Sequence, residues 1–120
     1  MRPETARWLA KATEDLEVAR YLLAGARWPA AAFYAQQAGE LALKALVVER
    51  SARIVRTHSL IVLAEEVKAP AEIVAQARRL TPAYVAQRYP DAATDVAEPE
   101  SRELARLAEE VVRWVRNQLS

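Results

Sequence analysis

The stretch of the chain best equipped for chemistry is ERSARIVRTHSL, residues 49–60, which holds the only histidine, His58. Arg50, Arg53 and Arg56 precede it at intervals of three residues. An imidazole exchanges protons near neutral pH, and a guanidinium holds a phosphate and the charge that grows on it. Arg53 and His58, with four residues between them, therefore suffice for metal-free RNA cleavage. The same spacing also fits a histidine that only begins a helix beside solvated arginines.

A second polar feature interrupts the apolar segment PAAAFYAQQAGELALKALVVE. It consists of Gln36, Gln37, Glu40 and Lys44. On a helix these side chains fall within about 100° of arc, and Glu40 stands four residues before Lys44, the favourable order for an ion pair. We interpret the two as a buried or half-buried ion pair that Asp15 and Arg88 could join. Alternatively, the stripe lines a pocket or a dimer interface, where the glutamines offer neutral hydrogen bonds.

Composition excludes several classes of protein. The chain has no cysteine, so disulfides, zinc fingers and thiol catalysis are ruled out. One histidine is too few for a typical transition-metal site, and we expect no metal ion or cofactor. The formal net charge of +1 implies no bulk attraction to nucleic acid or acidic lipid, so any polyanion must meet a local patch.

Nothing in the hydropathy pattern indicates a membrane protein. The first residues, MRPETARWLAKATED, are charged throughout and do not resemble a signal peptide. No apolar run approaches the roughly 20 residues that a membrane-spanning helix requires. We therefore expect a cytoplasmic protein.

The elements that must position these residues are all helices. The chain has only two glycines, and its apolar residues recur at the helical period. Most of the six prolines stand where a helix would begin, the position at which proline is tolerated. The expected helices cover about residues 3–24, 29–50, 59–67, 70–88 and 99–119. We predict an all-α fold, an up-and-down antiparallel bundle of four main helices plus a short fifth, in a single domain over residues 1–120.

Four segments in this order resemble the small HEPN-domain proteins, and together they span nearly the whole chain. They are KATEDLEVARYLL, AAFYAQQAGELALKALV, RTHSL and LTPAYVAQRYPD. The elements QQAGELALKALV and RYPD are the more specific ones. The resemblance implies a helical bundle that commonly forms a homodimer. It also implies either a metal-independent ribonuclease or toxin, or a module that binds nucleotides beside a small nucleotidyltransferase.

The resemblance assigns roles to particular residues. Many members carry an arginine, four to six residues and then a histidine, and two such motifs meet across a dimer. Arg53 and His58 fit this spacing, with His58 as the proton-transfer group and Arg53 as the phosphate contact. Active members usually have a polar residue after the arginine, where this chain has Ile54. The tyrosine that receives a nucleotide in silenced toxins is replaced by Leu60.

Two functions follow as expectations. In the first, the protein is the HEPN module of a toxin–antitoxin-like or nucleotidyltransferase-associated system and cleaves RNA with Arg53 and His58. In the second, it is a non-catalytic module that binds a nucleotide or a partner nucleotidyltransferase. In both, other residues contact RNA or nucleotide or shape the site. These are Gln37, Glu40, Lys44, Arg50, Arg56 and Arg88.

Overall fold

Five α-helices follow one another in the computed structural model of the chain. Their bounds are α1 Pro3–Ala24, α2 Trp28–Ser51, α3 Leu60–Glu66, α4 Ala71–Arg88 and α5 Glu98–Leu119. The structure describes the backbone of residues 1–88 and 96–120, and the side chains of residues 1–81 and 96–120. No strand occurs in these ranges. The predicted all-α bundle of four main helices and one short helix is confirmed.

Local sequence signals account for most helix ends. Proline occupies the first turn of α1, α2 and α5, where its missing N–H costs no hydrogen bond. Gly25 follows α1, and its N–H donates to the Tyr21 carbonyl oxygen at 3.2 Å. Ser59 caps α3, because its Oγ accepts a hydrogen bond from the Val62 N–H at 3.3 Å.

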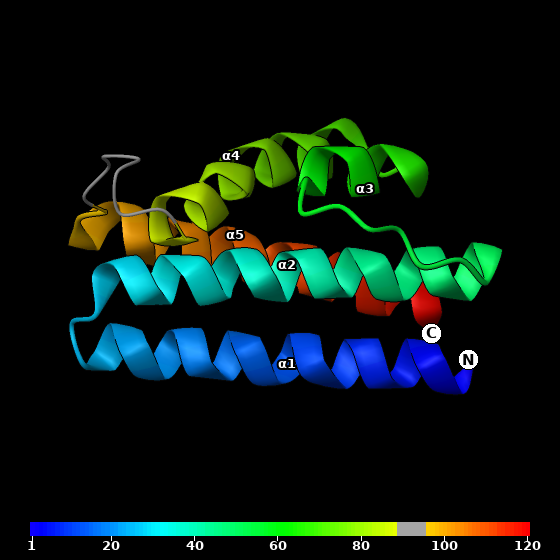
Figure 1. The fold of residues 1–120 in the computed structure, drawn as a ribbon, viewed down its shortest axis with the longest axis horizontal. Helices are drawn as coiled ribbons and strands as arrows, with labels where there is room; N and C mark the ends of the chain where they lie inside the picture. Colours follow the sequence, from blue (N-terminus) through cyan, green and yellow to red (C-terminus); the bar gives the residue numbers. More distant parts are fainter. Residues whose placement is uncertain (89–95) are drawn as a thin grey trace.

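The central element is α2, which packs against all four other helices (Figure 1). It runs antiparallel to α1, with α5 behind it and with α3 and α4 over its other side. Small residues such as Ala35, Ala38 and Ala42 are fully buried along α2, which lets the neighbouring helices approach closely. The almost wholly apolar sequence of α2 accounts for this central position, since such a helix needs neighbours on several sides.

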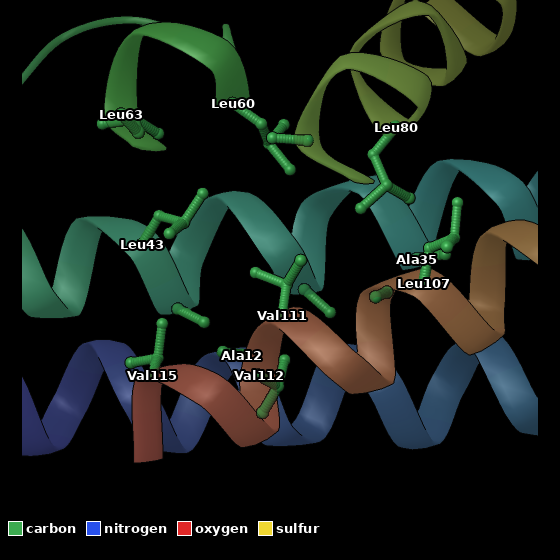
Figure 2. Packing of buried hydrophobic residues seen from close by; sticks show 14 of the residues in the cluster. Ala12, Ala35, Leu43, Leu60, Leu63, Leu80, Leu107, Val111, Val112 and Val115 are labelled. Carbon is green, nitrogen blue, oxygen red and sulfur yellow. The ribbon is translucent and has the colours of Figure 1, made fainter. Parts of the chain in front are cut away.

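One hydrophobic cluster joins the helices. Figure 2 shows Leu60 of α3, Leu80 of α4 and Val111 of α5 around α2. All three side chains are fully buried, as is Leu43 of α2. Among the described residues, no helix is both long and apolar enough to cross a membrane.

Gly39 is the point of closest approach within this cluster. A Cβ atom there would lie 2.9 Å from Leu60 Cδ2 and 3.4 Å from Leu80 Cδ1. We expect Gly39→Val to lower the free energy of unfolding by about 1–3 kcal/mol, because buried side chains must leave their rotamers to admit it. Urea denaturation followed by circular dichroism measures the change.

The second glycine provides the control. A Cβ atom at Gly25 meets nothing closer than 3.7 Å, and its φ of −92° suits any residue. Gly25→Ala should therefore change the free energy of unfolding by no more than about 0.5 kcal/mol. Equal decreases in the free energy of unfolding for Gly39→Val and Gly25→Ala would contradict the packing described around Gly39.

Candidate functional site

The segment between α2 and α3, which contains His58, runs back along α2 (Figure 1). The helix ends where Ala52 adopts a left-handed conformation, with φ 55° and ψ 24°. The chain then turns and runs over the polar stripe of α2, and Ser59 begins α3. The histidine therefore stands next to a helix start, as the simpler interpretation held, and also over the stripe.

Glu40 is the centre of a hydrogen-bonded cluster under this segment. Its side chain is only 3% exposed, and Oε2 accepts from Lys44 Nζ at 2.9 Å. Gln36 Nε2 donates to Glu40 Oε1 at 2.9 Å and to the His58 carbonyl oxygen at 3.4 Å. The His58 Nδ1 atom lies 3.2 Å from both carboxylate oxygens. The interpretation of Glu40 and Lys44 as a buried ion pair is confirmed.

This cluster defines the state of the histidine ring. An ionised carboxylate only accepts hydrogen bonds, so the Nδ1 atom facing Glu40 carries the proton. The contact fixes the orientation of the ring. More than half of the His58 side chain is exposed, whereas the carboxylate that orients it is buried. The arrangement resembles the buried acid that orients the histidine in a hydrolytic triad, without a nucleophilic serine.

A groove with a volume of about 410 Å³ opens beside His58. Its lining comprises Trp8 of α1, Lys44 of α2 and residues 54–58. Lys44 Nζ lies 5.8 Å from the centre of the Trp8 ring, within the range of a cation–π contact. The groove thus combines an aromatic ring, two cationic side chains (Lys44 and Arg56) and an oriented imidazole.

The three predicted arginines are in three different places. Arg56 lines the groove. Arg53 is exposed, is absent from the lining, and forms an ion pair with Glu66 of α3. Arg50 donates to the Val67 carbonyl oxygen at 2.7 Å and to Gln118 Oε1 at 3.2 Å, so it ties α2 to the ends of α3 and α5.

The remaining predicted residues are not joined to this cluster by the described contacts. Gln37 is half-buried, and its buried Oε1 atom has no hydrogen-bond partner among the described residues. Asp15 forms its ion pair with Lys11, at 3.3 Å, and not with Lys44. Burial raises the pKa of the Asp15 carboxyl, and the Lys11 charge opposes this shift. The side chain of Arg88 lies outside the described residues.

Sequence reasoning did not identify every residue of the groove. Trp8, Val55 and Thr57 line the groove and were not among the predicted site residues. Only the spacing of facing residues in an antiparallel α1–α2 pair would have placed Trp8 next to Lys44. No group of three or more His, Cys, Asp or Glu side chains that could hold a metal ion is found in the described part of the chain.

Residues 5–118 match the family model of the HEPN domain. The chain belongs to the HEPN family. The His58 groove is therefore part of a HEPN fold. The resemblance inferred from the four sequence segments is confirmed.

Solved structures similar to this HEPN chain come from bacteria and archaea. A protein of Thermus thermophilus is 30% identical, with a TM-score of 0.88 over 97% of this chain and 98% of the other. An archaeal HEPN homologue is 30% identical, with a TM-score of 0.83 over the whole of both chains. A HEPN domain protein of Thermotoga maritima is 26% identical, with a TM-score of 0.77 over 94% of this chain and 97% of the other. No curated protein matches the sequence.

The Glu40 cluster predicts a measurable effect on the stability of this HEPN bundle. Glu40→Gln leaves Lys44, whose side chain is 10% exposed, without its counter-charge. We expect the free energy of unfolding to fall by about 3–5 kcal/mol, because an unpaired charge is then buried. Adding Lys44→Met should recover part of that loss, since the double variant buries no charge.

An exposed pair of the same spacing serves as the control. Glu98 accepts from Arg102 at 2.9 Å, and both side chains are about half exposed. Glu98→Gln should cost less than about 1 kcal/mol, because water screens the pair. If thermal and urea denaturation show similar decreases in the free energy of unfolding for Glu40→Gln and Glu98→Gln, Glu40 is not the centre of a buried cluster.

Proposed function

We propose that this protein is a HEPN module that binds RNA in the His58 groove and cleaves it without a metal ion. The observation that carries the proposal is the contact between His58 Nδ1 and the buried Glu40 carboxylate, at 3.2 Å. A histidine that only began a helix would need no such contact. An oriented and exposed imidazole in a groove is what proton transfer to a bound ligand requires.

The proposed reaction uses the 2′-hydroxyl of RNA as the nucleophile. Its oxygen attacks the adjacent phosphorus, the 5′-oxygen of the next nucleotide leaves, and a 2′,3′-cyclic phosphate forms. His58 Nε2 takes the hydroxyl proton and then gives it to the leaving 5′-oxygen, so the imidazole ends the step neutral. Glu40 stabilises the imidazolium that forms when Nε2 takes a proton, because the carboxylate faces Nδ1.

The groove also supplies contacts for the substrate. The Trp8 ring offers a surface on which a base can stack, and Arg56 offers a charge for a phosphate. Arg53 is the phosphate contact that the family motif implies, yet here it pairs with Glu66 outside the groove. In the proposed homodimer, the motifs of two protomers meet, and Arg53 leaves Glu66 to contact the RNA.

A second candidate function is a non-catalytic module that binds a nucleotide or a small nucleotidyltransferase. The Arg53–Glu66 ion pair favours it, because the arginine of the motif is occupied. Ile54 favours it too, since active members usually carry a polar residue there. In this case, the groove would hold the nucleotide with Trp8 and Arg56, and His58 would transfer no proton.

RNA cleavage by the purified protein in EDTA separates the two functions. We expect cleavage to continue in EDTA and to fall by about 10²–10⁴-fold in His58→Ala, the usual contribution of a general acid or base. Arg53→Ala and Arg56→Ala are compared side by side. The variant with the larger loss identifies the arginine that contacts the transferred phosphate.

Arg106→Ala provides the control for the loss of an exposed arginine. Arg106 pairs with Glu103 and Glu110 on α5 and is absent from the His58 groove, so this variant should retain full activity. Cleavage that is absent, or equal in wild type and His58→Ala, would refute the ribonuclease. Stable co-purification with a co-expressed nucleotidyltransferase would then support the second function.

The proposed homodimer has a candidate contact residue in Ile54. Its side chain is 63% exposed and lines both the His58 groove and a smaller one that includes Val48 and Ala52. A large apolar side chain between two grooves is a typical place for a partner subunit to bind. Burial of this residue against a second copy would also close one side of the site.

Light scattering at micromolar concentration tests the dimer. We expect wild type to have the mass of a dimer and Ile54→Asp to be monomeric, because a carboxylate would be buried at the interface. Val62→Asp is the control, since Val62 is 49% exposed on α3 and lines neither groove. A monomeric wild type, or dimers of both variants, would contradict the assignment of Ile54 to the interface.

A further inference from the structure

A second groove lies between α1 and α5, with a volume of about 270 Å³. Each helix presents residues at positions i, i+3, i+4 and i+7, so each contributes a single face. The α1 face comprises Thr13, Leu16, Glu17 and Arg20, and the α5 face comprises Glu109, Val112, Arg113 and Arg116. Leu16 and Val112 are buried and form an apolar floor under a charged rim. None of these residues lines the His58 groove.

The rim holds more positive than negative charge. Three guanidinium groups face two carboxylates across the groove. Glu109 is shared, because its Oε2 lies 2.8 Å from Arg20 Nη2 and its Oε1 lies 3.1 Å from Arg113 Nη2. The two arginines hold the pKa of the Glu109 carboxyl below its usual range, chiefly through the hydrogen bond from Arg20. The single Glu109 carboxylate is thus the counter-charge of two guanidinium groups.

Arg116 has no carboxylate partner among the described ion pairs. Its Nη2 atom donates to Thr13 Oγ1 at 2.5 Å, and the Thr13 hydroxyl donates in turn to the Leu9 carbonyl oxygen at 3.0 Å. The neutral hydroxyl holds the guanidinium across the groove without cancelling its charge. Arg113 and Arg116 stand one helical turn apart on α5, so their guanidiniums can contact the same ligand.

We propose that this groove binds a phosphate group, with Arg113 and Arg116 on one side and Arg20 on the other. Each guanidinium has five N–H donors in a planar fork, and the ion pairs of Arg20 and Arg113 and the hydrogen bond of Arg116 to Thr13 use one nitrogen of each. A phosphate accepts several such bonds at once, and the bidentate pairing suits its geometry. The phosphate belongs either to a small phosphorylated molecule or to the backbone of an RNA strand. The proposal does not depend on catalysis at His58.

Two probes distinguish these sources. Inorganic phosphate is titrated by calorimetry at constant ionic strength, and a fluorescent RNA oligonucleotide is titrated by anisotropy. We expect saturable phosphate binding with a Kd of about 1 mM or lower. The double variant Arg113→Gln/Arg116→Gln should weaken it at least about tenfold, because two charge-assisted hydrogen bonds are lost.

The matched control is Arg102→Gln/Arg106→Gln, on the same helix. Both arginines are 55% exposed, pair with glutamates on α5 and lie outside the groove. This variant should bind both probes as wild type does, and thermal unfolding shows that each variant is folded. If Arg113→Gln/Arg116→Gln weakens the binding of RNA but not that of inorganic phosphate, the groove binds the RNA backbone. If neither probe binds, or both double variants weaken binding equally, the proposal is overturned.

Discussion

The buried carboxylate of Glu40 is the constraint on which the rest of the site depends. It lies on the central helix, where burial would be costly without partners, and it is satisfied by a lysine, a glutamine and a histidine. Two of these partners are on α2 itself, and the third arrives from the segment before α3. The charge that α2 must neutralise therefore also determines where that segment lies.

Two further contacts hold the helix that follows this segment. Arg53 binds Glu66, and Arg50 binds the carbonyl oxygen of Val67 at the end of α3. These bonds hold α3 against the end of α2, while the hydrophobic cluster holds α3 through Leu60 and Leu63. The contacts with α2 and with the hydrophobic cluster together fix α3, and α3 in turn holds the segment that forms the groove wall.

The fold could be predicted because its signals are local. Proline and Gly25 mark helix ends, and the apolar pattern of α2 indicates a central helix. The Glu40–Lys44 pair was predictable for the same reason, since both residues lie on one helix four positions apart. Contacts between elements were not predictable in this way. The contact of Asp15 with the Glu40–Lys44 pair, which would join α1 to α2, is not formed, because Asp15 pairs with Lys11 on its own helix. The pairing of Arg53 with Glu66 depends on the path of an irregular segment.

Residues 54–58 form most of the groove wall, yet they contribute little to the core. Ile54, Arg56 and His58 are exposed, so their replacement changes the shape and charge of the groove without opening a cavity in the bundle. Val55 alone packs against the hydrophobic cluster. Lys44 and His58 belong both to the groove and to the Glu40 cluster, whereas Ile54 and Arg56 belong to the groove and not to the cluster. Changes at Ile54 and Arg56 can therefore alter the ligand while the four long helices stay the same.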